Sequence, residues 1–456
     1  MTAHAISTRR PRISPFVYPI VYFSLVITVG AVLLHSPFSL ARGPISWINA
    51  LFTATSATCV TGLVVVDTGT FFTGWGQAVI AGLIQLGGIG IMTVTGLIFY
   101  LWRRRISLVD RVAVGDSLLH DASFNLGGFL AQVILWSLAI EAVGAVLIFL
   151  EAPAAFSPLS AGFHAVSAFC NAGFALTGDS LMTWKSRWDL NLTFMALIIL
   201  GGIGFGVLVE IRLWIATRQP LQRKNVRRHQ MSWYATVILK TTAFLIIAGT
   251  IVIFLSEMIN PHTHHTLLTA LFQSVSCRTA GFNTVDIDQM TNVSLLVMVL
   301  LMFIGAAPGS CAGGIKVTTA RTLLAFVRAQ LRGSRQAEIG RFAVDRVTLN
   351  KALTLLIFAG VLVAVSVLVL NVTESSGIPH PQTRGLSLDI LFEAVSAFGT
   401  VGLSTGLTPH LSTAGRVIII LLMFIGRLGP ILFLSALQSY QKEIRYEKPE
   451  ESLLIG

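Results

Sequence analysis

Long apolar runs recur along the whole of this chain, and they restrict the folds open to it more than any other feature. The clearest examples are residues 16–34, 129–150, 242–255, 295–304, 352–370 and 417–425. A helix needs about 20 apolar residues to cross the hydrocarbon core of a bilayer, and the longer runs approach that length. Charged residues make up only 12% of the chain, against about 25% in a usual soluble protein. These features predict an all-α polytopic membrane protein.

The distribution of basic residues predicts how the chain is oriented in the membrane. Most lysines and arginines lie in five clusters, at residues 9–12, 103–111, 212–228, 321–351 and 442–448. The positive-inside rule places these clusters in the cytoplasm, together with both termini. No cleavable signal peptide is evident, so the first apolar run is expected to be a membrane helix. The net charge of +11 is then a topology signal and a contact for anionic lipid, not a sign of nucleic-acid binding.

A short glycine motif occurs four times in a matching context. The four copies are TSATCVTGL, SAFCNAGF, SCRTAGFN and SAFGTVGL, with the glycines Gly62, Gly173, Gly281 and Gly402. Each copy has a serine a few residues before the glycine, and the third copy is one residue shorter between Ser276 and its glycine. Further on, LGGIG occurs twice and LLMFIG occurs twice. The separation of the last two glycine motifs equals the separation of the two LLMFIG motifs, which indicates internal repeats.

The chain is therefore predicted to consist of four pseudo-symmetric repeats, at residues 1–116, 117–228, 229–340 and 341–456. Each repeat contains a membrane helix, a pore loop and a second membrane helix, which gives eight full spans around a central cation pore. The pore loops are expected near residues 47–63, 158–174, 265–282 and 386–403. Each holds about 12 residues before its glycine, too few to cross the bilayer. A cytoplasmic tail is expected at 440–456.

The four pore loops offer backbone carbonyls and no carboxylate at their glycines. A ring of carbonyls can replace the water shell of a weakly hydrated cation, as potassium filters do, and the negative end of each preceding helix adds attraction. The alternative is that the glycines only let helices pack closely. The predicted filter residues are Val60, Thr61, Gly62, Asn171, Ala172, Gly173, Thr279, Ala280, Gly281, Thr400, Val401 and Gly402.

A second glycine-rich stretch is predicted to break the second span of the third repeat, at residues 304–320. Proline and glycine weaken a helix, and breaks at membrane depth favour cavity linings, although a packing kink is the alternative. The candidate gate residues here are Gly305, Ala306, Ala307, Pro308, Gly309, Ser310, Cys311, Ala312, Gly313, Gly314 and Lys316. Arg427 is a further gate candidate, because an intramembrane charge usually faces the interior. It could instead pair with an acid, and Lys316 could reach the cytoplasmic edge.

The motifs together resemble the Ktr/Trk/HKT superfamily of potassium transporters, and most closely its KtrB-type membrane subunit. The resemblance covers nearly the whole chain and is carried by TSATCVTGLVVVDTG, SAFCNAGF, RTAGFN, SAFGTVGL followed by GLTP, and LLMFIGRLGP. It implies a potassium-selective translocating subunit of a potassium uptake system, with Gly62 typical of the potassium-selective members. It also implies that residues 304–320 form an intramembrane gating loop and that Arg427 belongs to the permeation barrier.

The resemblance further implies partners and a location. A homodimer, a cytoplasmic KtrA-type ring of nucleotide-binding regulator subunits, and the plasma membrane of a bacterium are expected. Potassium is the expected transported ion, and sodium either couples to its movement or stimulates it. The chain itself carries no sign of a cofactor site or of a nucleotide-binding domain.

Two other functions remain as alternatives to a cation pore. A coupled secondary transporter of another substrate would be expected to show inverted repeats, whereas these repeats are parallel. A membrane enzyme would need converging acids, histidines or cysteines, and the acids here are scattered. Four cysteines without a CxxC pair are expected to be packing residues. His262, His264 and His265 are expected to lie in a solvated loop, and the effect of Arg278 beside the third glycine is open.

Overall fold

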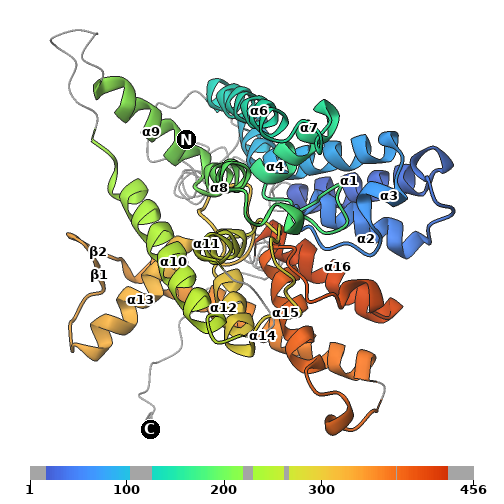
Figure 1. Cartoon of the computed structure of the whole chain (residues 1–456). Helices are drawn as coiled ribbons and strands as arrows, with labels where there is room; N and C mark the ends of the chain where they lie inside the picture. The colour runs from blue at the N-terminus through green and yellow to red at the C-terminus, as the bar shows by residue number, and fades with distance from the viewer. Residues whose placement is uncertain (1–16, 103–125, 219–229, 261–265, 376, 430–456) are drawn as a thin grey trace, which may run out of the picture.

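The computed structural model describes residues 17–102, 126–218, 230–260, 266–375 and 377–429, and these residues are mostly helical (Figure 1). The first two quarters of the chain follow one order: a long helix, a short helix, an extended loop and another helix. In the first quarter these are α1 (Val17–His35), α2 (Trp47–Thr58) and α4 (Gly74–Trp102), with the short elements η1 (Pro37–Ser39) and α3 (Thr68–Phe71). In the second they are α6 (Leu126–Glu151), α7 (Pro158–Phe169), α8 (Trp188–Gly202) and α9 (Phe205–Arg218), with η2 (Met182–Trp184).

The second half of the chain repeats this order. The third quarter holds α10 (Trp233–Glu257), α11 (Leu267–Ser276), α12 (Asn292–Phe303) and α13 (Val317–Leu331). A small antiparallel hairpin of β1 (Glu338–Ile339) and β2 (Phe342–Ala343) follows. The fourth quarter holds α14 (Arg346–Ser375), α15 (Leu386–Gly399) and α16 (Thr413–Leu428), with η3 (His380–Gln382) and η4 (Thr408–His410).

The first long helix of each quarter provides a segment that can cross a membrane. Within the described ranges, four helical segments are long and apolar enough: Val17–His35, Ala131–Glu151, Trp233–Glu257 and Arg346–Ser375. Their outward faces carry exposed leucine, valine and isoleucine side chains, as expected for surfaces in contact with lipid. A fifth span results if α8 and α9 are counted together. The predicted total of eight spans, the repeat boundaries and the cytoplasmic termini stay predictions.

The second helices are less regular than the sequence analysis expected. A break at 304–320 was predicted; α12 ends at Phe303, and α13 begins at Val317, with its first four residues inside the predicted segment. In addition, α8 and α9 meet at an angle of 107°. Gly204 adopts a φ of +88° at this corner, a conformation that glycine reaches without strain. The N–H of Phe205 then donates to the carbonyl of Gly309 over 3.0 Å, outside its own helix. This partner is distant in sequence, so the local pattern did not reveal the bend.

The short helices α2, α7, α11 and α15 begin at defined caps and are buried along most of their length. They hold 12, 12, 10 and 14 residues, too few to cross a bilayer. Ser46, Ser157 and Thr266 cap the first three by accepting a hydrogen bond from a backbone N–H in the first turn. α15 begins instead at Gly385.

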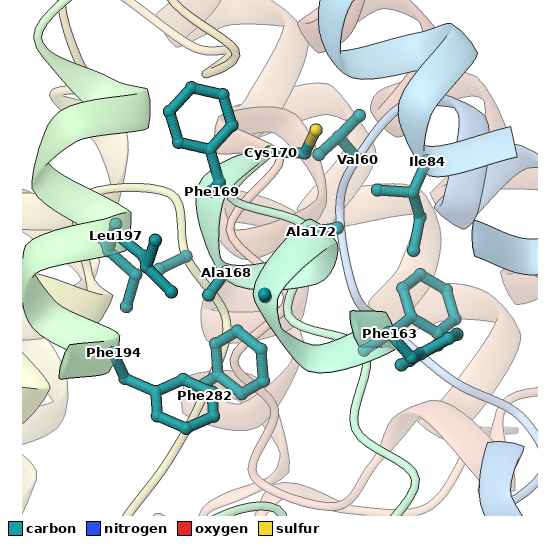
Figure 2. Packing of buried hydrophobic residues seen from close by; sticks show 14 of the residues in the cluster. Val60, Ile84, Phe163, Ala168, Phe169, Cys170, Ala172, Phe194, Leu197 and Phe282 are labelled. Atoms are coloured by element: carbon teal, nitrogen blue, oxygen red, sulfur yellow. The ribbon is translucent and has the colours of Figure 1, made fainter. Parts of the chain in front are cut away.

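The four quarters pack around a common centre in sequence order. Contacts join α4 to α6 and α7, α8 to α11, α12 to α15, and α16 back to α2, and Figure 1 shows the blue, green, yellow and red parts of the chain following one another around the middle of the molecule. Phenylalanine side chains fill the joints between quarters. In Figure 2, Phe194 of α8 lies against Phe282, which follows α11, with 5.3 Å between the ring centroids. Because α16 also contacts α2, the last quarter closes the circle onto the first.

Candidate functional site: a ring of four glycine loops

Each short helix ends in a loop with the same unusual backbone. A residue two positions before the glycine has positive φ in all four loops, and so does the glycine itself. The non-glycine residues are Val60, Asn171, Thr279 and Thr400, at 56°, 60°, 72° and 50°. When residues with positive and negative φ alternate, successive peptide groups have the same orientation, so that their N–H groups lie on one side of the loop and their carbonyls on the other. Left-handed φ is uncommon for residues other than glycine, and β-branched residues adopt it only where the surroundings demand it.

One backbone hydrogen bond recurs in the four loops. The N–H of the residue before the glycine donates to the carbonyl of a serine near the helix end, over 2.7–2.9 Å: Thr61 to Ser56, Ala172 to Ser167, Ala280 to Ser276, and Val401 to Ser396. In the third loop this bond encloses one residue fewer than in the others. The shorter spacing seen in the sequence is thus absorbed within the last turn of α11.

The serine hydroxyls explain why the motif contains serine. Those of Ser56 and Ser396 accept a hydrogen bond from the N–H of the ring glycine, each over 3.1 Å. Ser167 and Ser276 instead donate to the carbonyl of the residue after the glycine. In each loop the serine therefore attaches the helix end to the glycine region. The sequence pattern located these serines but did not reveal what they bind.

The four glycines form a closed ring. A Cβ atom built on any one of them would lie 2.8–3.3 Å from the Cα of the next, in the order Gly62, Gly173, Gly281, Gly402 and back to Gly62. The same atom would come within 2.8 Å of the carbonyl oxygen of the residue before that next glycine. These carbonyls belong to Ala172, Ala280, Val401 and Thr61. Any side chain would therefore displace a carbonyl group of the ring, which is why glycine stands at all four positions.

Small residues in the second helices bring them close behind three of the loops. A Cβ on Gly87, Gly201 or Gly426 would overlap the carbonyl oxygen of Thr58, Phe169 or Phe398. These three oxygens lie at equivalent positions of the first, second and fourth loops. Gly305, which matches Gly426 in the LLMFIG motif, faces the carbonyl of Gly313 instead. The third loop is thus supported differently, by the broken segment that follows α12.

A polar residue stands at the same buried position of each short helix, and the sequence analysis missed it. The four residues are Thr53, His164, Gln273 and Glu393, each no more than 2% exposed. His164 donates from Nδ1 to the carbonyl of Ser160 over 2.7 Å and accepts at Nε2 from the N–H of Leu176 over 3.2 Å. Glu393 accepts hydrogen bonds from the hydroxyls of Ser404 and Thr408. Their nearly constant distance from the ring glycine, one residue shorter in the third loop, was the signal available in the sequence.

His164 and Glu393 hold the chain that leaves the ring. Leu176 follows Gly173, and Ser404 and Thr408 follow Gly402. The imidazole of His164 thus bonds the segment after the second ring glycine to α7, and the carboxylate of Glu393 bonds the segment after the fourth ring glycine to α15. Different chemistry serves the same purpose in two quarters, so the ring is only pseudo-symmetric.

Residues 304–316, the part of the predicted segment 304–320 that precedes α13, lie largely buried between the second and fourth quarters. On one side Ala307 N donates to Gly202 O over 3.0 Å, and Cys311 N donates to Gly201 O over 3.3 Å. On the other side Gly314 N approaches Gly426 O at 3.4 Å. This segment, named the gating loop below after the role predicted for it, is therefore attached both to the α8–α9 corner and to α16.

Arg427 joins the gating loop to the first quarter. Its side chain is 3% exposed. The guanidinium donates to the carbonyls of Cys311, of Gly87 over 2.5 Å and of Gly88 over 3.2 Å. Among the residues that the structure describes, its hydrogen bonds go to carbonyls and not to the acid that the sequence analysis left as an alternative. Lys316 likewise turns back, because its Nζ donates to the carbonyl of Ala312 over 2.6 Å.

Two acids not considered above, Glu141 and Glu210, also have hydrogen-bond partners. Glu141 accepts from Gln85 Nε2 over 2.9 Å, and Glu210 accepts from both the N–H and the hydroxyl of Ser232. All four cysteines are buried and free, as expected for packing residues. His262, His264 and His265 lie outside the described residues. Within those residues, no group of three or more histidines, cysteines or acids is arranged to hold a metal. The donors that the ring offers a cation are backbone carbonyls.

Fold and ring together define a helical membrane protein with a central site built from backbone groups. A model of the TrkH family, described as cation transport protein, matches residues 13–440. The chain is 40% identical to the Ktr system potassium uptake protein B of Bacillus subtilis (strain 168), over 95% of both chains. It is 36% identical to the potassium/sodium uptake protein NtpJ of Enterococcus hirae, over 98% of both. The protein therefore belongs to the TrkH family of cation transport proteins, which confirms the resemblance seen in the sequence.

The fold has a counterpart among solved structures. The crystal structure of the potassium transporter TrkH from Vibrio parahaemolyticus matches with a TM-score of 0.72, over 94% of this chain and 86% of that chain. The sequence identity is 19%. The helical arrangement described above is thus a known membrane architecture.

Proposed function

We propose that this protein is the potassium-selective ion-translocating subunit of a potassium uptake system. The observation that carries the proposal is the closed ring in which four glycines and the four carbonyls before them alternate. Such a ring offers oxygen ligands without a carboxylate. Carbonyl rings suit a weakly hydrated monovalent cation, whereas divalent cations are usually met by aspartate or glutamate. The relatives' names refer to potassium uptake and to potassium/sodium uptake.

The filter is assigned to the loop residues around the ring, from Val60, Asn171, Thr279 and Thr400 to the glycine of each loop. The alternating φ of these residues supports the assignment, since it lets carbonyls share one side of each loop. The helices α2, α7, α11 and α15 end three to five residues before the ring glycines, and the partial negative charges of their C-terminal ends favour a cation there.

The gating loop and Arg427 are assigned to the barrier on the cytoplasmic side of the filter. The loop is rich in glycine and held by few hydrogen bonds from separate quarters, which suits a segment that moves as a unit. The guanidinium adds a fixed positive charge close to the path of the ion, and like charges repel.

The four repeats, at 1–116, 117–228, 229–340 and 341–456, each contribute one side of this pore, and together they supply eight spans. Repetition of helix, short helix, loop and helix in every quarter supports this division. The basic clusters place both termini in the cytoplasm, and a bacterial plasma membrane is the proposed location. The chain acts as a homodimer with a cytoplasmic nucleotide-binding ring, in keeping with the word "system" in the name of a relative.

Ion competition tests this function directly. Purified protein is reconstituted into vesicles loaded with potassium, and uptake of radioactive rubidium is measured against external potassium or sodium. Potassium is expected to compete at far lower concentration than sodium. Equal competition by both ions, or no rubidium uptake with or without a regulator subunit, contradicts a potassium filter.

A further inference from the structure

Arg278 stands where no other loop carries a charge. It lies three residues before Gly281, and the corresponding residues of the other loops are Cys59, Cys170 and Gly399. The side chain is only 4% exposed. Burying a charge without a partner is unfavourable by several kcal/mol. A neutral side chain of similar size would pack here at lower cost, so the charge must serve something other than packing.

The guanidinium reaches the first residue of the gating loop. Its Nη1 donates to the carbonyl oxygen of Ile304 over 3.3 Å. Ile304 is the C-cap of α12, where helical hydrogen bonding stops, so its carbonyl lacks a partner further along the helix. A cation at a helix C-terminus is also favoured by the helix dipole. Arg278 therefore links the third glycine loop to the point where α12 breaks.

The other nitrogens of the guanidinium are unused. Nε and Nη2 are buried and, among the described residues, have no hydrogen-bond partner. Beside them lies a cavity of about 10 Å³ between α8, α10 and the gating loop, lined by Ile199, Gly202, Thr242 and Ala306 among others. A space of that size holds about one water molecule. Within the described part of the chain, the guanidinium thus has one hydrogen bond to protein, and that bond is to the gating loop.

We propose that Arg278 is a positioning residue that couples the third filter loop to the gating loop and favours the closed gate. This inference rests on the proposed function, because it needs a filter and a gate to couple. Movement of the gating loop, and of Ile304 with it, away from Arg278 would remove the hydrogen bond that this buried charge makes to the described part of the chain. The closed arrangement is therefore stabilised by Arg278, and the position of the third loop depends on the position of the gate.

Replacement of the charge should release the gate without altering the ring itself. We expect Arg278→Met to raise rubidium flux in the absence of a regulator by roughly tenfold, which corresponds to the lower end of the stabilisation that a hydrogen bond to a charged group provides. Arg278→Lys keeps the positive charge but loses the planar arrangement of guanidinium donors, and should give a smaller rise in rubidium flux than Arg278→Met. The preference for rubidium over sodium should stay as in the wild type in both variants.

The experiment uses the full chain in vesicles, with Thr242→Val as a matched control. That substitution alters the wall of the same cavity without touching the contact to Ile304, and it should leave flux unchanged. A second measurement reports how accessible the gating loop is to a reagent in solution. Cys311 is buried in the gating loop, so its reaction with a thiol reagent, in a background with the other three cysteines replaced by alanine, should be faster in Arg278→Met.

The two measurements separate the possible failures. Wild-type flux together with wild-type labelling of Cys311, in an Arg278→Met protein that elutes as a single species, overturns the coupling. A changed preference between rubidium and sodium at unchanged flux also overturns it, and makes Arg278 part of the filter. If the wild type carries neither ion, the proposed function fails, whereas the labelling of Cys311 still reports whether Arg278 holds the loop.

Discussion

Arg427 is the side chain whose replacement tests the barrier most sharply. It bonds to Cys311 in the gating loop and to Gly87 and Gly88 in α4, so one guanidinium joins two segments that are distant in the sequence. We expect Arg427→Gln to raise the flux that passes without a regulator. Glutamine is shorter and uncharged and carries one donor group, so it cannot bond to both segments at once.

The size of the effect follows from the bond that must break when the gate opens. In the proposed mechanism, displacement of the gating loop would separate the guanidinium from Cys311, whereas its bonds to α4 would stay in both states. A hydrogen bond to a charged group contributes about 1.5–3 kcal/mol. Its loss shifts the closed–open equilibrium by roughly 10- to 150-fold, since each 1.36 kcal/mol is a factor of ten.

Rubidium uptake into potassium-loaded vesicles measures this shift, and Arg416→Gln is the matched control. Arg416 lies on the same helix, α16, but bonds to Asn49 and to the carbonyl of Pro409, far from the gating loop. It should leave the regulator-independent flux unchanged. The reasoning about the barrier is refuted if well-folded Arg427→Gln protein conducts no faster than the control.

Two further predictions concern the support of the ring. Glu393→Ala leaves the hydroxyls of Ser404 and Thr408 without their acceptor and should lower the free energy of unfolding by about 2–4 kcal/mol. Glu393→Gln retains an acceptor and should lose less. Thermal unfolding in detergent compares the variants, and equal stability of wild type and Glu393→Ala contradicts the role assigned to Glu393. Gly201→Ala places a methyl group on the carbonyl of Phe169 and should abolish transport. Gly206→Ala, with open space around its Cβ position, should transport normally. Comparable rubidium uptake by both variants contradicts the close packing of α8 against the second loop.

The glycine motifs carried most of the information about the site. Gly62 and its three counterparts, each with a serine at nearly the same distance, were enough to locate four loops after short helices. The reason is physical: only glycine allows such a close approach of backbone to backbone, so the residue type itself indicates where the loops meet. The register of the third loop, with its shorter spacing, was also readable before the structure was known.

Features that depend on distant partners were not readable. The bend between α8 and α9 needs the carbonyl of Gly309 to receive the N–H of Phe205, and nothing near Gly204 indicates that partner. Arg427 was singled out as an intramembrane charge, but its bond to Gly87 spans most of the chain. His164 and Glu393 were passed over because different residue types serve one structural position, so only its distance from the ring glycine marks it and no shared residue does.

The central claim is that the glycine ring is the filter, and Gly62→Ser tests it most directly. A Cβ at Gly62 would lie 2.5 Å from the carbonyl oxygen of Ala172, on a backbone with a φ of +99°. Gly82→Ser is the control, since nothing lies within 4 Å of its Cβ position. In vesicles, with sodium competing against rubidium, Gly62→Ser should lose the preference that wild type and Gly82→Ser retain. An unchanged preference in folded Gly62→Ser protein would mean that the four loops only pack the helices together.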